Sequence, residues 1–200
     1  MTEITQVEKK SGRPRSEDAD KAIIEATLDL LAEVGVGAMS IESIASRAGV
    51  GKTTIYRRWS DKESLICDAM VALKGPPPQP HGETLRDDLI ELGDAAARGR
   101  ESARRRKLYA CFVGEMSRHP ALMERYRQAV IKPRRDVIRG VLDRAAQRGE
   151  LRADLDVEFM IDLVTAPQMH WSLQHPEDDL TRELIEQFVD GVLDGLRPRD

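Results

Sequence analysis

Apolar residues recur every three or four positions along most of this 200-residue chain, and no stretch alternates apolar and polar residues as a half-buried strand does. The pattern predicts an all-α protein. Pro133 predicts a kink or break in the long helix of the second half, and Pro167 a bend in the next one. The expected helices cover about residues 16–34, 41–48, 52–58, 61–73, 83–98, 101–117, 121–148, 157–173 and 179–196.

A stretch rich in proline and glycine, residues 75–82, cannot be helical and predicts a linker between two parts of the chain. Residues 1–15 are polar and basic, which predicts a flexible arm. Residues 16–74 then form a small helical domain that includes a connecting helix, and residues 83–200 form a larger one.

The stretch from Ser40 to Trp59 carries the start and stop signals of two short helices joined by a tight turn. Ser40 is a good N-cap, and Gly49 follows the last apolar residue of the first helix, where a left-handed stop is cheapest for glycine. Val50 can fill the angle between the helices. The spacing predicts a helix-turn-helix.

In the second of these helices, Ile55 and Trp59 point to the same side and predict its buried face. Thr53 and Arg57 point the opposite way. Such a face of hydroxyls and cations suits a DNA major groove, because both side-chain types bind phosphates and base edges. The alternative is a solvated helix whose charges only keep the domain soluble. Lys52, Thr54, Tyr56 and Arg58 flank the predicted contact face.

Residues 17–66 resemble the DNA-binding domain of the TetR family of bacterial transcription regulators. The residues that carry the resemblance are Ile23 to Leu31, Gly35, Ser40-Ile41, Ile44-Ala45, Ala48-Gly49-Val50, Thr54 to Arg57, Trp59, Lys62-Glu63 and Leu65. The remaining two-thirds resembles the variable effector domain of that family. The resemblance implies a three-helix DNA-binding domain followed by a helical domain for effector binding and dimerisation.

The expected DNA contacts extend beyond the second helix of the motif. Ser60 to Glu63 reads as a capping box that starts the connecting helix, whose amides and Lys62 could hold a phosphate. In the arm, closely spaced arginines could enter a minor groove, or the arm could be a tail with no role. The predicted DNA-binding residues are Ser40, Lys52, Thr53, Thr54, Tyr56, Arg57, Arg58 and Lys62, with Arg13 and Arg15 of the arm.

The last two helices are apolar over a wider arc than one core contact needs. In residues 179–196, one stripe is formed by positions 184, 188 and 192 and a second by 185, 189 and 193. The width predicts a two-fold dimer, which the resemblance also implies, unless both helices lie centrally in the core of a monomer. The predicted interface residues are Leu163, Ala166, Leu184, Ile185, Phe188, Val189 and Val192.

The sequence says least about an effector pocket. Such a pocket uses aromatic and flexible apolar walls with a few polar anchors, although each candidate could instead belong to an ordinary core. The predicted walls are Tyr109, Phe112, Met116, Met169 and Trp171, and the predicted anchors are Tyr126, Gln168 and His170.

The net charge of −4 does not argue against DNA binding, because cations concentrate in two local patches, Lys9–Arg15 and Arg47–Lys62. Two cysteines far apart give no disulfide or metal framework. No apolar run is long enough to span a membrane, and residues 1–16 lack the apolar core of a signal peptide, so we expect a cytoplasmic protein.

No enzyme motif, cofactor site or metal site is expected. Gly49 to Thr54 distantly resembles a phosphate-binding loop, but Ser46 stands where its first glycine is required, and a helix precedes it. We therefore expect a homodimeric repressor that binds a palindromic operator and is released by a small hydrophobic or amphipathic ligand. The alternative is a helical regulator without a small-molecule effector, controlled by a protein partner or acting as an activator.

Overall fold

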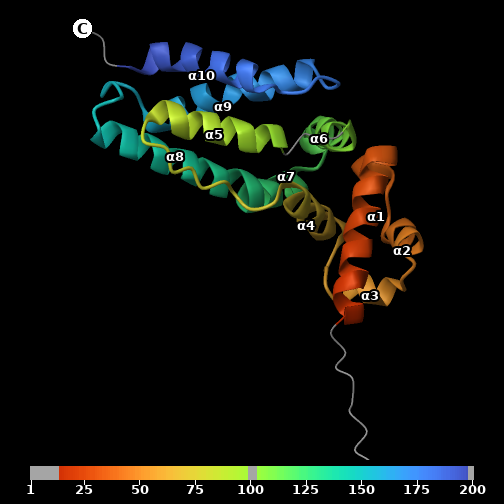
Figure 1. Cartoon of the computed structure of the whole chain (residues 1–200). Helices are drawn as coiled ribbons and strands as arrows, with labels where there is room; N and C mark the ends of the chain where they lie inside the picture. Colours follow the sequence, from red (N-terminus) through yellow and green to blue (C-terminus); the bar gives the residue numbers. More distant parts are fainter. Residues whose placement is uncertain (1–13, 99–102, 198–200) are drawn as a thin grey trace, which may run out of the picture.

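The computed structural model describes residues 14–98 and 103–197, and within these ranges every regular element is helical, as the sequence predicted. The order of the elements is shown in Figure 1. They are α1 (Pro14–Ala38), α2 (Ile41–Ala48), α3 (Lys52–Tyr56), α4 (Lys62–Lys74), α5 (Leu85–Arg98), α6 (Ala103–Glu115), the 3₁₀ turn η1 (Met116–Arg118), α7 (Pro120–Tyr126), the π-helical turn η2 (Arg127–Ile131), α8 (Lys132–Gln147), α9 (Val157–Gln174) and α10 (Arg182–Leu196).

Two helix boundaries differ from the prediction. Helix α1 begins at Pro14 rather than after Ser16, since proline is compatible with the first turn of a helix, and its helical geometry breaks at Gly35 (φ 74°) as expected. Helix α4 is capped by Asp61 and not by Ser60: the Asp61 carboxylate accepts from the Ser64 amide at 2.7 Å, and Ser64 completes the capping box. Both caps were chemically possible, and the register of α4 decides between them.

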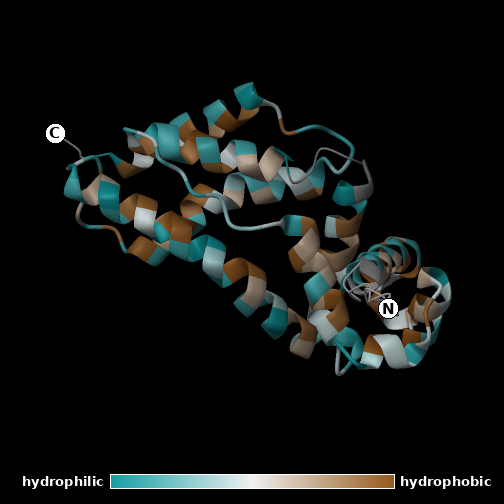
Figure 2. Cartoon of the chain, turned by 60° about the horizontal axis from the view of Figure 1, so that its bottom comes forward, coloured by the Kyte–Doolittle hydropathy of each residue, from teal (hydrophilic) through white to brown (hydrophobic). Residues whose placement is uncertain are grey.

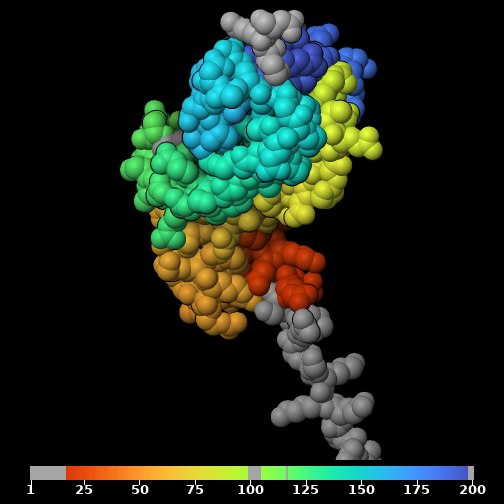
Figure 3. All heavy atoms as spheres, turned by 90° about the vertical axis from the view of Figure 1, so that its left-hand side faces the viewer, coloured from red at the N-terminus to blue at the C-terminus, as the bar shows by residue number. Residues whose placement is uncertain are grey.

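The first hydrophobic core joins α1–α4 with α6 and α7, which come from beyond the linker. Leu108 and Phe112 of α6 and Leu122 and Tyr126 of α7 are buried in it with residues of α1 and α4. In Figure 3 the green α6–α7 segment sits directly above the orange helix-turn-helix segment. We call this packing unit the junction core.

The second hydrophobic core, here called the bundle core, contains α5, α8, α9 and α10. Its buried residues include Leu89 of α5, Val141 of α8, Ile161 of α9 and Ile185 of α10. Figure 2 shows apolar stretches, in brown, alternating with hydrophilic ones along these helices, which is the pattern of a helix with one buried face.

The predicted helix 121–148 is interrupted by a π-helical turn near Pro133 rather than broken, because the backbone stays helical from α7 into α8. The π-helical turn η2 lies before this proline, between α7 and α8, so the chain leaves the junction core and enters the bundle core at this turn. Proline has no amide hydrogen to donate and crowds the preceding turn. The wider π turn leaves room for the proline ring there. Helix α9, in contrast, continues through Pro167 as one helix.

The predicted linker, residues 75–82, is non-helical and is held against the second half of the chain. The buried Asp88 carboxylate accepts from the Gly82 amide at 2.8 Å and from Arg144 at 3.1 Å, while Arg144 also donates to the Pro80 carbonyl. The non-helical stretch thus covers the predicted residues 75–82. The two cores do not divide the chain at this stretch, because α6 and α7 follow it and yet pack with α1–α4. In the ranges described, no helix has the length and apolar character needed to cross a membrane.

Candidate DNA-binding surface and effector pocket

Helix α2 is fixed at both ends by its sequence. The Ser40 hydroxyl accepts a hydrogen bond from the Ser43 amide at 3.1 Å, and Gly49 ends the helix in the left-handed conformation (φ 67°). Ile41 and Ile44 bury one face against the junction core. Because α2 ends abruptly at Gly49, the chain changes direction there before α3 begins.

Helix α3 is anchored by the two residues that the sequence predicted as its buried face. Ile55 is completely buried, and Trp59 is 8% exposed with its indole N–H donating to Asp68 at 2.8 Å. Thr53 and Arg57 are exposed, and Tyr56 is 55% exposed. The short helix therefore presents a hydroxyl, a phenol and a guanidinium on its outer side.

Most cations around α3 already have acid partners. Arg47 forms a bidentate pair with Glu33, and Lys52 pairs with Glu42 at 2.7 Å. These two pairs are exposed, and the Lys52 hydrogen bond holds the pKa of the Glu42 carboxyl below its usual value. Exposed pairs are weak and exchange readily for phosphates.

Arg58, a predicted DNA contact, has partners within its own domain. Its guanidinium forms an ion pair with Asp20 of α1 and donates to the Thr54 carbonyl at 3.3 Å, which brings it against its own domain. Arg58 therefore ties α3 to α1, and a DNA contact would cost it that partner.

Lys62, another predicted DNA contact, has acceptors within its own domain. Its ammonium donates to the carbonyls of Val36 (2.8 Å) and Met39 (2.9 Å), at the end of α1 and in the turn before α2. These carbonyls lie where a helix leaves acceptors without partners, and a lysine there is a stabilising cap. Lys62 thus stabilises the end of α1, and its predicted phosphate contact stays a prediction.

Arg57 differs from its basic neighbours, because the described part of the chain supplies it with no acid partner. It lies directly opposite Ile55 and Trp59, as the sequence predicted. Of the other predicted DNA contacts, Arg13 lies outside the described residues, and so does the side chain of Arg15.

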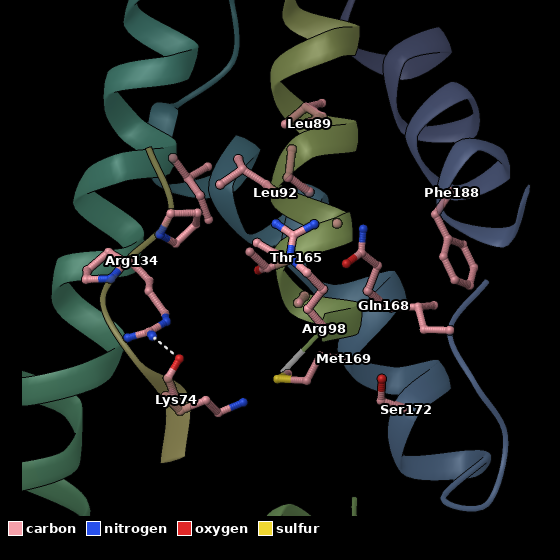
Figure 4. A pocket seen from close by; sticks show the side chains of 18 of the residues that line it. Lys74, Leu89, Leu92, Arg98, Arg134, Thr165, Gln168, Met169, Ser172 and Phe188 are labelled. Atoms are coloured by element: carbon pink, nitrogen blue, oxygen red, sulfur yellow. Dashed lines mark hydrogen bonds between the residues drawn. The ribbon is translucent and has the colours of Figure 1, made fainter. Parts of the chain in front are cut away.

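A cavity of about 580 Å³ lies between helices of the bundle core and the linker. Its walls come from α5, α8, α9 and α10, and its rim from Lys74, Pro76, Pro77 and Pro78. Figure 4 shows the labelled side chains converging on it, among them Leu89 and Leu92 of α5, Gln168 of α9 and Phe188 of α10.

Three of the eight predicted pocket residues line this cavity: Tyr109, Gln168 and Met169. Phe112 and Tyr126 do not, because they pack on each other in the junction core with ring centroids 4.7 Å apart. Burial accordingly raises the pKa of the Tyr126 phenol. The prediction that Phe112 and Tyr126 line the pocket is therefore wrong, because residues far apart in the chain decide which core each aromatic side chain enters.

The other predicted pocket residues lie elsewhere. His170 is exposed, and Trp171 stacks on His175 with ring centroids 4.9 Å apart, so neither lines the cavity. The side chain of Met116 lies outside the described part of the chain. Within that part, no group of His, Cys, Asp or Glu side chains could hold a metal ion.

Sequence reasoning missed four cations that line the cavity: Lys74, Arg98, Arg105 and Arg134. They come from α4, α5, α6 and α8, so only the tertiary fold brings them together. The one available signal was the position of Lys74 and Arg98 in the last turns of their helices, which is also an ordinary place for a cation.

The two apolar stripes of α10 have different roles. Ile185, Val189 and Leu193 are buried within this subunit, so the predicted interface contacts of Ile185 and Val189 are wrong. Leu184, Phe188 and Val192 are half-buried, and the latter two also line the cavity.

On α9 the exposed side carries several apolar residues. Phe159 and Met169 are each 52% exposed, Leu173 is 38% exposed, and Ala166 is exposed between them. These residues follow one another at helical spacing and form what we call the α9 stripe, Phe159–Ala166–Met169–Leu173.

Two family models match the chain. Residues 23–68 match the model described as bacterial regulatory proteins, tetR family, and residues 79–192 match the model of the tetracyclin repressor-like C-terminal domain. The two matches together span the helix-turn-helix and the bundle core.

Individual proteins agree with these matches. The chain is 34% identical over 190 residues to YdeS of Bacillus subtilis, an uncharacterized HTH-type transcriptional regulator (93% of this chain, 96% of the relative). It is 30% identical over 189 residues to the DNA-binding transcriptional repressor TetR of Mycobacteroides abscessus (90% and 94%). Among solved structures, the regulator FadR of Bacillus subtilis in complex with stearoyl-CoA has a similar fold, with TM-score 0.73, 17% identity, and coverage of 88% and 98%.

Proposed function

We propose, from the premise that this chain belongs to the TetR family of bacterial transcriptional regulators, that α3 is its DNA-reading helix and that a ligand in the bundle core controls it. The family assignment makes it a helix-turn-helix transcription regulator. The residues that contact DNA, the mode of dimerisation and the response to a ligand are the parts that we propose.

The observation that carries the DNA contact is the orientation of α3. Ile55 and Trp59 fix one side of the helix in the junction core, and this leaves Thr53, Tyr56 and Arg57 on the outer side. Arg57 has no acid partner among the described residues, so it can bind a phosphate or a guanine edge without breaking an ion pair. Lys52 and Thr54 lie at the margins of this face.

The test is fluorescence anisotropy with duplexes selected from a random library, over several salt concentrations. Arg57→Ala should weaken specific binding by about 1–3 kcal/mol and relax the preference at one base position. Arg118→Ala is the matched control, because Arg118 is an exposed arginine far from α3 in the chain. Equal binding by Arg57→Ala and the parent would place the reading face elsewhere.

For assembly we propose a two-fold dimer through the α9 stripe and the neighbouring half-buried residues Leu163, Leu184 and Phe188. An exposed apolar row on a helix of this length is a normal interface and a costly free surface. Two copies of α3 would then meet successive major grooves about 34–36 Å apart, which requires a palindromic operator. Footprinting that shows one asymmetric half-site would contradict this arrangement.

The cavity supports control by a small molecule over the effector-free alternative. Its volume of about 580 Å³ falls within the range of about 300–1,000 Å³ that ligand sites occupy, whereas a regulator answering only to a protein partner has no use for such a cavity. Occupation of the cavity would shift α4 and thereby separate the two α3 helices from groove spacing, so that the protein acts as a repressor released by its ligand.

Incubating the purified protein with a cell extract and identifying the retained molecules by mass spectrometry tests this part directly. A retained molecule should lower operator affinity when it is added back. Retention of a molecule without any effect on DNA binding would remove the regulatory role of the cavity and leave the DNA contact intact.

A further inference from the structure

The cavity combines apolar walls with cations, and no carboxylate side chain lines it among the described residues. Its apolar surface comes from Leu89, Leu92, Val164, Phe188 and Val192. Its charged surface comes from Lys74, Arg98, Arg105 and Arg134. A surface of this composition matches a ligand that has both an apolar body and a negative charge.

Arg134 is the most informative of these cations. Its guanidinium donates to the carbonyls of Gly75 (2.7 Å), Lys74 (3.2 Å) and Val130 (3.3 Å), and in the described part of the chain no carboxylate pairs with it. Figure 4 draws its bond to the Lys74 carbonyl. Partial burial lowers the pKa of this guanidinium, because removal from water disfavours its charged form.

Arginines elsewhere in the same half of the chain behave differently. Arg135 pairs with Glu158 and Asp162, Arg144 with the buried Asp88, and Arg182 with Asp94. Carboxylates are therefore the usual partners of arginine in this bundle, and among the described residues Arg134 has only carbonyl acceptors instead. A half-buried cation that only neutral carbonyls satisfy gains most from an incoming anion.

Two of the four cations, Lys74 and Arg134, are separated in space from Phe188, whereas Arg98 of α5 lies between them (Figure 4). Lys74 and Arg134 lie together at the α4–α8 side of the cavity, and Phe188 of α10 lies on the opposite side (Figure 4). The Lys74 ammonium lies 4.4 Å from the centroid of the Tyr109 ring, so an aromatic face borders the charged side. The separation favours an elongated ligand with its charge at one end.

We propose that the effector is an amphipathic anion, an apolar chain ending in a carboxylate or a phosphate. Its charged group binds beside Lys74, Arg98, Arg105 and Arg134, and its chain lies against α5, α9 and α10. This inference rests on the proposed control by a ligand in the cavity and adds the chemical class of that ligand.

The position of Arg134 connects the ligand to the DNA-reading helix. Its acceptors, Lys74 and Gly75, are the end of α4, and α4 packs in the junction core that holds α1. An anion that draws the guanidinium away takes a stabilising cation from the C-terminal carbonyls of α4. The charge of the ligand would thus act, through Arg134, on the C-terminal end of α4, the helix that follows the helix-turn-helix.

The experiment compares four probes with the same ten-carbon chain: decanoate, decyl phosphate, decanol and decyltrimethylammonium, all below their micelle concentrations. Isothermal titration calorimetry on the full chain should show the two anions binding at least tenfold more tightly than decanol and the cation. The order of decanoate and decyl phosphate tells whether the natural anion is a carboxylate or a phosphate.

The double variant Arg98→Gln/Arg105→Gln should lose at least tenfold in affinity for the anions and keep its affinity for decanol. Arg134→Gln should do the same, with circular dichroism as the check on folding, since it also caps α4. The matched control is Arg86→Gln, which removes an exposed arginine of α5 that does not line the cavity.

Equal or tighter binding of decanol or of the cation overturns the proposal, and so does an unchanged anion preference in the double variant. Failure of all four probes to bind overturns it as well. Operator anisotropy run in parallel separates this result from the proposed function: release of DNA by decanol without an anion preference would keep a ligand-controlled regulator and reject only the anion.

Discussion

The junction core and the bundle core are both made of helices, but they differ in how completely their side chains are buried. In the junction core, Phe112, Ile55 and Leu65 are buried almost completely, and the side chains leave little room to move. The bundle core surrounds a cavity, and Phe188 and Val192 on its wall are only half-buried. The difference fits the proposed division of labour, in which the bundle core binds a ligand and the junction core holds the helix-turn-helix.

The largest expected effect distinguishes the two stripes of α10 within the bundle core. Val189→Glu places a charge where the side chain is 4% exposed, so we expect a loss of about 5 kcal/mol or more in the free energy of unfolding, or no folded protein. Leu184→Glu, on the half-buried stripe one turn away, should stay folded. Chemical denaturation followed by circular dichroism measures both.

The same pair tests the proposed dimer. Leu184→Glu should run as a monomer in light scattering while keeping its helical spectrum. A folded and dimeric Leu184→Glu would remove α10 from the interface and leave the α9 stripe alone to account for dimerisation.

Truncating one aromatic residue in each core compares their packing directly. Phe112→Ala should cost about 3–5 kcal/mol, because the cavity left in the junction core cannot collapse. Phe188→Ala should cost less than half of that, since it only enlarges a space that already exists. Urea denaturation of both variants gives the values, and equal losses would contradict the division into a tight and a yielding core.

A glycine marks the one tight point that we find beside the cavity. A Cβ atom at Gly93 would lie 2.4 Å from Cγ2 of Ile185 and 3.0 Å from Nε2 of Gln168, so both side chains must shift. Gly93→Ala should therefore cost about 1–3 kcal/mol in unfolding free energy despite the better helix propensity of alanine.

The Gly93→Ala variant also reports on the ligand site, because Gln168 lines the cavity. Exposed Gly191→Ala on α10, where nothing lies within 4 Å of the added Cβ, is the control and should be neutral or slightly stabilising. A Gly93→Ala protein as stable as the parent would show that α5 and α10 can separate freely.

The smallest expected effect concerns the contact between α7 and α4. Hydrogen bonding from the Ser64 amide, with a smaller contribution from Arg125, holds the pKa of the Asp61 carboxyl below its usual value of 3.8. Because the folded pKa is the lower one, this stabilisation is complete above the unfolded pKa and is lost as pH falls through the folded pKa.

Asp61→Asn keeps a capping side chain and removes the charge. Its stability should therefore fall below that of the parent by less than about 1 kcal/mol at pH 7, and the difference should shrink below pH 3.8. Thermal unfolding over a pH series measures it, with Asp136→Asn as the comparison, because the Asp136 carboxylate pairs with Lys132 and Arg139 of α8 but caps no helix. A difference that does not change with pH would assign the effect to packing.

Local chemistry explains which parts could be predicted from the sequence. The helix periods, the Gly49 stop, the buried side of α3 and the interruption near Pro133 follow from neighbouring residues, and the structure has them all. Lys62 and Arg58 were assigned to DNA because the sequence shows their charge but not the carbonyls of α1 and the Asp20 carboxylate that face them. The cationic side of the cavity depends on four helices meeting, and no local pattern encodes that.

Helices α6 and α7 follow the linker in sequence but complete the junction core. The helix-turn-helix domain of this regulator therefore does not form a core of its own. A chimera that joins residues 1–74 to the effector half of another regulator would replace Leu108, Phe112, Leu122 and Tyr126 with side chains shaped for a different α1 and α4. Transplanting its DNA specificity therefore means exchanging the exposed residues of α3 alone, or moving the inner faces of α6 and α7 together with the helix-turn-helix domain.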